Sequence, residues 1–415
     1  MRASAKNLIA LATFFLPAAA LDAQNDWPQF LGPNRNGISA ETGLIDSIPA
    51  GGPKEVWRIS GGVGMSGLAI SRGKLLTLVQ KDGQQFLTAK NAETGAPLWE
   101  TPLTSQYENQ QGNGPRATPT IAGEKVYAYT GEGVLVCLNL ADGKLVWKHD
   151  VPSELKGKPA DYGMSCSPLV VGKNVLVAAG APQAAVVAYD AESGKLAWTA
   201  GDDPAGYSSP ALLDVGGQKQ IVVFTGASAI GLAPDKGTLL WRYPYETDYD
   251  ANIATPLAHR GQIFLSSGEN HGSVLLGLRQ DGDKFVPREM WTSQGASSKL
   301  RNEWQTSMLL DNHLYGFDNV GSAGPVTHLT CVEVATGKPA WQQARFGKGN
   351  LIAADGKLFI STMKGELVVV RATPKAYEEL GRATILGSTR QAPSLSNGKL
   401  YLRDDKDIVC LNVKK

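Results

Sequence analysis

The chain has 415 residues, of which 42% are hydrophobic and 19% are charged, a composition that supports a buried core and excludes a disordered protein. Lys and Arg number 40 against 39 Asp and Glu, so the sequence offers no basic surface for nucleic acid or anionic lipid. A chain of this length exceeds one ordinary compact core, which predicts either several domains or a repeat architecture.

Residues 1–23 are typical of a signal peptide. Basic residues precede an apolar run, 8–20, that is too short to span a bilayer. Cleavage is predicted after Ala23, with Ala20 as a second choice. No other stretch reaches 18 consecutive apolar residues. We therefore expect an exported protein, periplasmic or extracellular, without a transmembrane segment.

From residue 55 onward, one phrase recurs every 42 to 51 residues and ends in tryptophan. One copy runs from Asn91 to Trp99 and the next from Asn139 to Trp147. The glycine in the phrase lies where a hairpin turn needs a residue that tolerates positive φ. A structural docking role is assigned to seven tryptophans: Trp57, Trp99, Trp147, Trp198, Trp241, Trp291 and Trp341.

Upstream of each phrase, a Ser/Thr-Pro pair or its equivalent precedes two short alternating strands. In the copy at 116–150, four strands are predicted at about 117–122, 125–130, 134–139 and 144–148. Four strands every 40 to 50 residues are typical of a β-propeller blade. The copies lie at about 67–100, 116–150, 165–200, 207–243, 253–292, 304–343, 350–386 and 391–413.

The predicted fold is therefore an all-β, eight-bladed propeller of four-stranded antiparallel blades. The copy at 391–413 supplies three strands, and residues 55–59 supply the fourth, so that an N-terminal strand closes the ring. The seventh copy has no tryptophan near residue 382, which leaves a count of seven blades open. Residues 24–54 are expected to form an extension, and residues 55–415 one propeller domain.

The cysteines are expected to be structural and free of disulfides. Three of them, Cys137, Cys331 and Cys410, occupy one position of the third strand, and a cysteine behaves there as a small buried hydrophobe. Because these three lie in different blades, their Cα atoms are too far apart for a bridge. The other blades fill this position with Ala89, Ala188, Gly231 and Gly277.

The phrase Asp/Asn-x-x-Thr-Gly-x-x-x-Trp resembles the tryptophan-docking motif of the quinoprotein alcohol dehydrogenase-like propellers. The segments 26–39 and 206–210 are similar to those of exported bacterial proteins with PQQ-like repeats, and the resemblance covers residues 26–415. Assembly factors of the BamB type share this repeat. For such members the resemblance implies partner binding without quinone chemistry.

The same resemblance implies an alternative, a PQQ-dependent quinoprotein dehydrogenase. Such enzymes hold the quinone over a tryptophan, often beneath a disulfide between adjacent cysteines, and bind Ca²⁺ through Glu, Asn and Asp oxygens. This chain has no adjacent cysteine pair, and no calcium ligand or catalytic base can be matched residue by residue. We expect no cofactor and assign no catalytic residue; PQQ with calcium belongs to the alternative only.

Other candidate chemistry is sparse. The five histidines show no metal-ligand spacing, so no metal site is predicted. The carboxylates of Glu246, Asp248, Asp250 and Glu303 could include an acid/base pair, although carboxylates on loops are usually only solvated.

Aligning the innermost strands on their proline or its equivalent and stepping back three positions yields a ring of residues. Its members are Met65, Arg116, Ser165, Tyr207, Ile253, Trp304, Lys348 and Arg390. Propeller ligands usually bind where these positions converge at the channel mouth. The candidate ligand-binding residues are Arg116, Tyr207, Asn252, Trp304, Lys348 and Arg390.

Arginines and lysines beside polar-edged aromatics favour a small anionic or carbohydrate-like ligand, although the same residues would also line a hydrated channel without a ligand. We therefore expect an exported PQQ-like propeller that binds such a ligand or a cell-envelope protein, without redox chemistry of its own. A quinoprotein dehydrogenase is the alternative. A carbohydrate-active propeller has no positive support beyond export and the candidate mouth.

Overall fold

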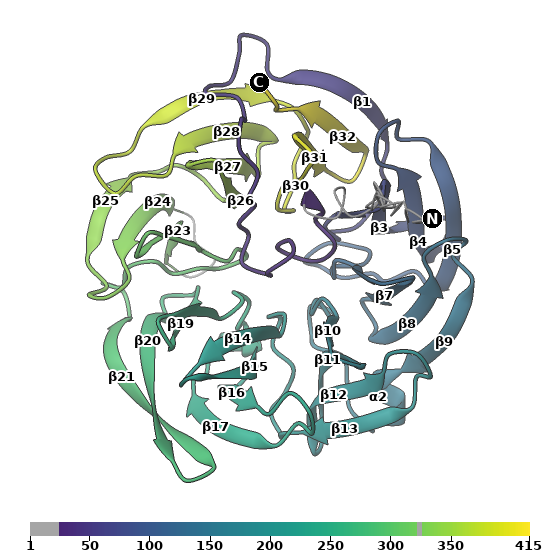
Figure 1. The fold of residues 1–415 in the computed structure, drawn as a ribbon, viewed down its shortest axis with the longest axis vertical. Coiled ribbons are helices and arrows are strands. Elements are labelled where there is room, and N and C mark those ends of the chain that lie inside the picture. Colours follow the sequence, from purple (N-terminus) through teal and green to yellow (C-terminus); the bar gives the residue numbers. More distant parts are fainter. Residues whose placement is uncertain (1–24, 322–325) are drawn as a thin grey trace, which may run out of the picture.

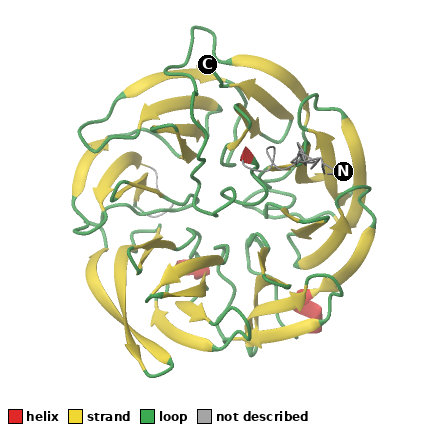
Figure 2. Ribbon diagram, in the orientation of Figure 1, coloured by secondary structure: helices red, strands yellow, loops and turns green. Residues whose placement is uncertain are grey.

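The computed structural model describes residues 25–321 and 326–415, and the predicted signal peptide lies outside these residues. Eight four-stranded antiparallel sheets stand around a central channel (Figures 1 and 2). The prediction of an eight-bladed all-β propeller is confirmed, and a count of seven is wrong. Helical structure is slight in the described chain, with α2 (Val151–Glu154) and a 3₁₀ turn at Asp248–Asp250.

Each blade is a meander that begins at the channel and ends at the rim. The innermost strands are β2 (Ala69–Ser71), β6 (Thr120–Ala122), β10 (Leu169–Val171), β14 (Ala211–Val215), β18 (Leu257–His259), β22 (Met308–Leu310), β26 (Gly349–Ala354) and β30 (Ser394–Ser396). The second strands are β3 (Lys74–Lys81), β7 (Lys125–Tyr129), β11 (Asn174–Ala181), β15 (Gln218–Phe224), β19 (Gln262–Ser267), β23 (His313–Val320), β27 (Lys357–Thr362) and β31 (Lys399–Arg403).

The outer half of each blade carries the recurring phrase. The third strands are β4 (Gln84–Asn91), β8 (Val134–Asn139), β12 (Ala184–Asp190), β16 (Ser228–Leu232), β20 (Gly272–Asp281), β24 (Val326–Glu333), β28 (Glu366–Arg371) and β32 (Asp407–Asn412). The outermost strands are β5 (Pro97–Ser105), β9 (Leu145–Asp150), β13 (Leu196–Ala200), β17 (Leu239–Pro244), β21 (Lys284–Gln294), β25 (Pro339–Gln343), β29 (Glu379–Thr384) and β1 (Lys54–Ser60).

The ring closes through the sheet β30–β31–β32–β1, in which strands from both ends of the chain pair. Trp57 of β1 lies opposite Cys410 of β32, and Ile59 lies opposite Ile408. The predicted closure by an N-terminal strand is confirmed. The last blade thus presents the same outer edge as the other seven.

The hydrophobic core lies between neighbouring blades, so the second and third strands are buried on both faces. In β28, for example, Leu367 to Val370 are fully buried. A strand covered on both sides needs apolar side chains in an unbroken run, which explains why these segments do not alternate as a half-exposed strand would.

A repeated polar contact joins successive blades at the channel. The hydroxyl of the Ser/Thr-Pro motif accepts a hydrogen bond from the equivalent backbone amide of the preceding blade. Thr118 N donates to Ser167 Oγ at 2.9 Å, and Ser167 N donates to Ser209 Oγ at 2.9 Å. The motif therefore serves blade-to-blade attachment, since its residue accepts through the hydroxyl from one neighbouring blade and donates through the amide to the other, as Ser167 does.

At the rim, the indoles of the outermost strands dock on the following blade. Five of them donate Nε1–H to a backbone carbonyl there: Trp57 to Ala92 (3.1 Å), Trp99 to Leu140 (3.1 Å), Trp147 to Ala191 (3.0 Å), Trp291 to Val334 (2.8 Å) and Trp341 to Thr373 (2.7 Å). A Cβ added to Gly194 would lie only 2.7 Å from the Trp147 ring. The glycine of the phrase thus permits close approach as well as its positive φ of 72°.

Trp241 departs from this pattern. Its Nε1 donates to Gln220 Oε1 within its own blade at 2.6 Å, and its ring lies over Gly231. The next blade offers no equivalent turn, because β20 and β21 form a longer hairpin whose Gly282 has nothing within 4 Å of an added Cβ. The indole of Trp241 therefore makes its hydrogen bond within its own blade, while its ring belongs to a hydrophobic cluster that includes residues of the next blade, such as Phe285.

In the fifth blade, the third-strand position assigned to a small residue is not the one predicted from the sequence. Cys137, Cys331 and Cys410 each lie directly opposite the tryptophan of their blade, but in the fifth blade Leu275, not Gly277, lies opposite Trp291. The register shift after this pair, between Leu275 and Leu276, has a counterpart in every blade and does not cause the difference. The β20–β21 hairpin is longer and continues past Gly277, which lies opposite Arg288, to the pair of Asp281 and Lys284. Sequence alignment alone does not show how far this hairpin extends.

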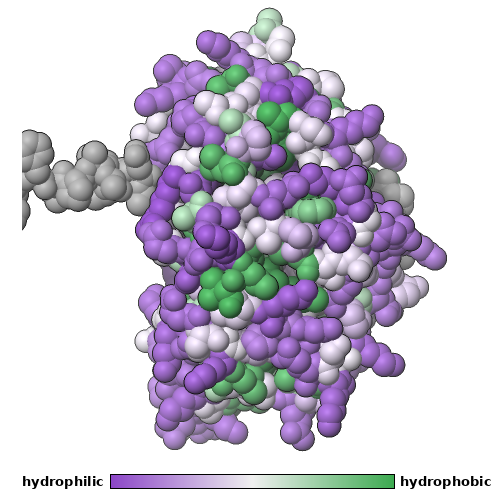
Figure 3. All heavy atoms as spheres, turned by 90° about the vertical axis from the view of Figure 1, so that its right-hand side faces the viewer, coloured by the Kyte–Doolittle hydropathy of each residue, from purple (hydrophilic) through white to green (hydrophobic). Residues whose placement is uncertain are grey.

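The rim exposes single aliphatic side chains between polar ones (Figure 3). Val56, Leu98 and Val146 each directly precede a docking tryptophan, so strand alternation turns them to solvent. Scattered apolar residues of this kind are normal on a protein surface. Among the described residues, no helix is long and apolar enough to cross a membrane.

A chain ending at residue 398 should lose its cooperative unfolding, because it lacks β31 and β32 and leaves β1 without a partner. Thermal melts followed by circular dichroism and tryptophan fluorescence would measure this. A chain ending at residue 413 keeps both strands and should melt as the intact protein does. If the shorter chain melts like the longer one, the closure is refuted.

All four thiols should stay free and react only on unfolding, because burial raises the pKa of Cys137, Cys331 and Cys410 to about 12 and that of Cys166 to about 11. Mass spectrometry after alkylation in non-reducing denaturant should find four modified cysteines. The same treatment of native protein at pH 8 should leave them unmodified. Recovery of an intramolecular bridge would contradict the prediction.

Candidate functional site

The N-terminal segment closes one end of the channel. It crosses the middle of the ring (Figure 1) and is held by bridges from Trp27 to Ile70 and from Ile38 to Ala353. Between them the buried guanidinium of Arg35 donates to the carbonyls of Ser167 and Pro168, both at 2.9 Å. Because these carbonyls belong to the third blade, Arg35 fixes the segment to the channel wall.

The other end opens into a cavity of about 620 Å³, which we call the mouth. All eight members of the ring derived from the sequence line it: Met65, Arg116, Ser165, Tyr207, Ile253, Trp304, Lys348 and Arg390. The remaining lining residues are Gln111, Tyr162, Tyr249, Ala251, Gly268, Glu269 and Glu303. The ring arises because each chain segment reaches its innermost strand from the same side.

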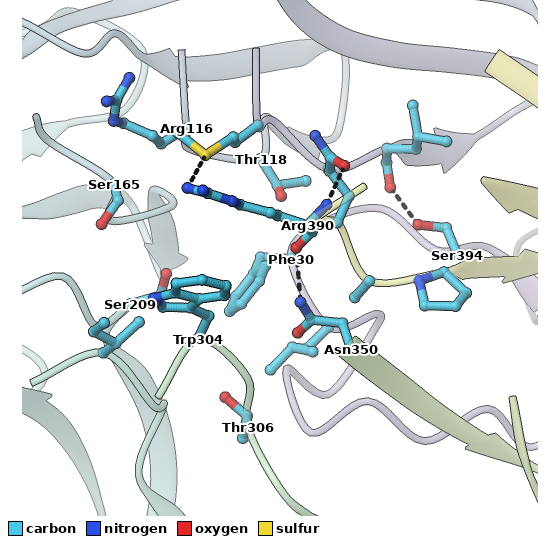
Figure 4. Close-up of a pocket in the computed structure, with 18 of the residues that line it drawn as sticks. Phe30, Arg116, Thr118, Ser165, Ser209, Trp304, Thr306, Asn350, Arg390 and Ser394 are labelled. Atoms are coloured by element: carbon cyan, nitrogen blue, oxygen red, sulfur yellow. Dashed lines mark hydrogen bonds between the residues drawn. The ribbon is translucent and has the colours of Figure 1, made fainter. Parts of the chain in front are cut away.

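A smaller chamber of about 130 Å³ lies deeper in the channel, between the ring and the N-terminal segment. Its wall includes Trp27 and Phe30 from the segment and the hydroxyls of Thr118, Ser209 and Thr306. Arg390 lies along Trp304 at the boundary of the two spaces, with Phe30 beside them (Figure 4). The mouth is thus a pocket with a floor.

Trp304 is the centre of the cationic part of the mouth. The Lys348 ammonium lies 4.2 Å from the centroid of its ring, and the Arg390 guanidinium carbon lies 4.7 Å from it. Arg390 also donates to the carbonyl of Gln111 at 2.6 Å. Both cations are therefore held over an aromatic face, where the ring quadrupole offsets part of their charge repulsion.

Glu303, directly before Trp304, is paired with Lys348. The ammonium lies 2.9 Å from Oε1, in hydrogen-bond geometry, and 2.7 Å from Oε2. Burial raises the pKa of the Glu303 carboxyl, while the hydrogen bond and charge of Lys348 act in the opposite direction. Arg390 differs from Lys348 in that its side chain donates to a backbone carbonyl, that of Gln111, and not to a carboxylate.

The segment that carries Glu303 and Trp304 begins at a buried ion pair. Arg301 donates from Nε to Asp318 Oδ1 at 2.7 Å and from Nη2 to Asp318 Oδ2 at 2.9 Å. Such a two-bonded pair fixes direction as well as distance. The position of Trp304 is therefore set by the sixth blade.

Arg116 lines the mouth, but its guanidinium is hydrogen-bonded to backbone carbonyls. It donates to the carbonyls of Tyr162 (2.6 Å), Gly112 (2.7 Å) and Gly114, and it stacks on the Tyr107 ring at 4.5 Å. In Figure 4 it points away from Trp304. Its main contribution is to hold the loop before β6.

Asn252 does not line the mouth, contrary to its assignment from the sequence. Its side chain is fully buried and donates to the carbonyls of Thr225 (2.8 Å) and Tyr245 (2.9 Å). The neighbouring Ile253 takes the ring position, and successive residues of an extended segment face opposite ways. Asn252 instead anchors the loop that carries Tyr249.

Two tyrosines of the mouth lie outside the ring alignment. Tyr162 and Tyr249 come from the loops before β10 and β18, and Tyr162 stacks on Tyr207 with ring centroids 5.7 Å apart. The Tyr207 hydroxyl accepts from the amide of Tyr162 at 3.2 Å, and burial raises the pKa of Tyr207 to about 12. Loop length is the signal that could have found these tyrosines. A long loop before an innermost strand can bring residues other than the aligned one to the channel.

The mouth does not match the donor set of a quinone–calcium centre. Its lining carboxylates are Glu269 and Glu303, and Glu303 is paired with Lys348. Residues 25–321 and 326–415 contain no cluster of three or more His, Cys, Asp or Glu side chains that could hold a metal ion. Calcium needs about six to eight oxygen ligands, and a quinone stacked on Trp304 would compete with two cations for its ring.

Comparison with curated proteins gives two partial likenesses. The chain is 28% identical over 207 residues to the outer membrane protein assembly factor BamB of Burkholderia pseudomallei (strain K96243), covering 48% of this chain and 45% of that protein. It is 36% identical over 90 residues to the quinohemoprotein alcohol dehydrogenase ADH IIB of Pseudomonas putida, covering 20% and 12%. The matches thus span less than half the length of these relatives.

Solved structures show the same fold. The quinohemoprotein alcohol dehydrogenase from Comamonas testosteroni superposes with a TM-score of 0.68 at 14% identity, covering 95% of this chain and 82% of that chain. BamB from Moraxella catarrhalis superposes with a TM-score of 0.59 at 14% identity, covering 87% and 98%. The model of the family described as outer membrane protein assembly factor BamB matches residues 41–130 and 87–343. With most of its length matched by that model, the chain belongs to this family of PQQ-like repeat propellers.

Proposed function

We propose that the chain is a binding propeller of the cell envelope that recognises a small anionic ligand at its mouth and carries out no dehydrogenation itself. The observation that carries the proposal is the placement of Arg390 and Lys348 over Trp304, beside a cavity of about 620 Å³. A volume of this size falls within the ~300–1,000 Å³ typical of small-molecule pockets. Arginine binds carboxylate, sulfate or phosphate through paired hydrogen bonds.

The envelope location rests on two supports. The predicted signal peptide implies export, and the curated relative from Burkholderia is named an outer membrane protein assembly factor. That name also supports a protein partner as a second candidate. We favour the small ligand because the cations lie around a hollow with a floor, whereas protein interfaces are generally broad and flat.

Replacing Arg390 with alanine should weaken binding of D-glucuronate or succinate. The lost charge-assisted hydrogen bonds contribute about 1.5–3 kcal/mol each, which corresponds to roughly a tenfold to hundredfold rise in Kd. Isothermal titration calorimetry at low ionic strength would measure this, with glucose as the uncharged probe. Trp304→Leu should also weaken binding, since it removes the ring that holds both cations.

The matched control is Arg279→Ala, which removes an exposed arginine on the β20–β21 hairpin, away from the channel. Arg116→Ala is the less informative variant, because its guanidinium holds backbone carbonyls. Thermal melts of each variant would show that the fold is intact. Binding that survives Arg390→Ala unchanged would place the site elsewhere, and absence of binding by every anion would leave a hydrated channel.

A quinoprotein dehydrogenase is the second candidate, favoured by the 36% identity to part of ADH IIB and by the tryptophan at the channel mouth. Because the carboxylates of the mouth do not form a calcium site, added pyrroloquinoline quinone with Ca²⁺ should give no alcohol- or sugar-dependent dye reduction. The assay compares protein, protein with quinone, and both with calcium. Saturable, calcium-dependent turnover would establish the second candidate in place of the first.

A further inference from the structure

The charged and aromatic residues of the mouth are segregated by blade. Lys348 and Arg390 come from the adjacent seventh and eighth blades, and we call these two residues the cationic side. Arg116 of the second blade lies at the border with the third blade, where it donates to the carbonyl of Tyr162. Tyr162, Tyr207 and Tyr249 precede β10, β14 and β18 of the third to fifth blades, and we call them the tyrosine side. Because the two groups of blades face one another across the channel (Figure 1), the mouth has two chemically different walls.

The tyrosine side is an open aromatic corner. Tyr162 lies between the other two rings, 5.7 Å from Tyr207 and 6.3 Å from Tyr249, and it makes angles of 27° and 51° with them. Tyr249 is 68% exposed, although a tyrosine gains most from burial of its ring. Its exposed face is thus available to a ligand in the mouth.

Carboxylates surround this corner. Asp161 directly precedes Tyr162, Asp250 directly follows Tyr249, and Glu269 lines the mouth. Burial and the charges of Asp161 and Glu269 raise the pKa of Tyr162, and burial and Asp161 raise the pKa of Asp250. Asp161 and Glu269 thus act on the Tyr162 ring, and Asp161 and Asp250 act on the Tyr207 ring. The three acids give the tyrosine side a negative potential, opposite to that of Arg390.

The loops on this side are held in costly backbone conformations. Tyr249 and Asp250 have φ of 61° and 54°, and Glu269 and Asn270 have φ of 51° and 61°. The surrounding structure enforces them: Asn252 binds the backbone of the first loop, and Asn270 Oδ1 accepts from Arg301 and from the amide of Gly321. Glu269 and Asn270 are the central residues of the β19–β20 hairpin turn, which the bond from His271 N to Gly268 O closes, and positive φ is usual there. The pair of Tyr249 and Asp250 lies in a longer loop, where its strained backbone sets the direction of the Tyr249 side chain.

We propose that the ligand of the mouth is zwitterionic, with an ammonium group against Tyr162 and Tyr249 and a phosphate or carboxylate at Arg390 beside Trp304. Aromatic faces bind alkylated ammonium groups through the ring quadrupole, and nearby carboxylates add to this attraction. The inference rests on the proposed function, since it takes the anion site at Arg390 as given. It adds the second charge of the ligand and the wall that recognises it.

Phosphocholine is the direct probe, because its quaternary ammonium donates no hydrogen bond and is held only by the aromatic faces and the charges of the nearby carboxylates. Calorimetry of the full-length protein should show phosphocholine binding at least about tenfold more tightly than glycerol 3-phosphate or choline. Tyr249→Leu should remove this advantage and leave glycerol 3-phosphate binding unchanged. Tyr249→Phe should retain it, because the ring is kept.

Arg390→Ala should weaken binding of both phosphate compounds, and Tyr243→Leu on the outer strand β17 is the matched control that should change neither. Cosedimentation with phosphatidylcholine vesicles, with and without free phosphocholine as competitor, distinguishes a lipid headgroup from a free solute; binding to either supports the proposal.

Equal affinity for phosphocholine and glycerol 3-phosphate would contradict the ammonium site at Tyr162 and Tyr249. The anion site at Arg390 would still be supported. Loss of both affinities in Tyr249→Leu would show that the ring only supports the fold. If Arg390→Ala has no effect on a phosphate compound that binds, the proposed function itself fails.

Discussion

The contact on which the propeller depends is that between the indole of one blade and the glycine turn of the next. Most of the hydrophobic core lies between blades, so each sheet is stable only if its neighbour stands at the correct angle. The indole sets that angle at the rim through ring packing and an Nε1–H hydrogen bond, as Trp147 does on Gly194 and Ala191. At the channel, Ser/Thr hydroxyls such as Ser167 fix the other end of the same interface.

One interface is made differently, and it borders the part of the ring that shapes the mouth. Trp241 turns onto its own sheet because the long β20–β21 hairpin of the fifth blade lacks the glycine turn. The fifth and sixth blades also contribute Glu269 and Glu303, and the buried Arg301–Asp318 pair fixes the segment that carries Trp304. The regular repeat thus supplies the frame, and its irregular blades supply charged residues of the site.

The N-terminal segment converts an open channel into a pocket. Without Arg35 and the bridges on either side of it, the ring would enclose a passage; with them, Trp27 and Phe30 form the lower wall of the inner chamber. A closed floor matters for recognition because it limits the water available to compete with Arg390 and Trp304 for a ligand.

The sequence by itself determined the four-stranded repeat, the closing strand and the eight channel positions, because all of these follow from a repeat whose spacing is set by strand geometry; that the degenerate seventh copy is a full blade was decided by the structure. Tertiary structure alone decided how far the β20–β21 hairpin extends, which places Leu275 opposite Trp291, and which way a loop residue such as Asn252 faces. Tertiary structure also decided that the Arg116 guanidinium donates to backbone carbonyls and that Tyr162 and Tyr249 line the mouth. The physical reason is that a repeat encodes packing between equivalent positions, whereas the inter-blade loops have no equivalent in the other blades and take their conformation from the contacts that surround them.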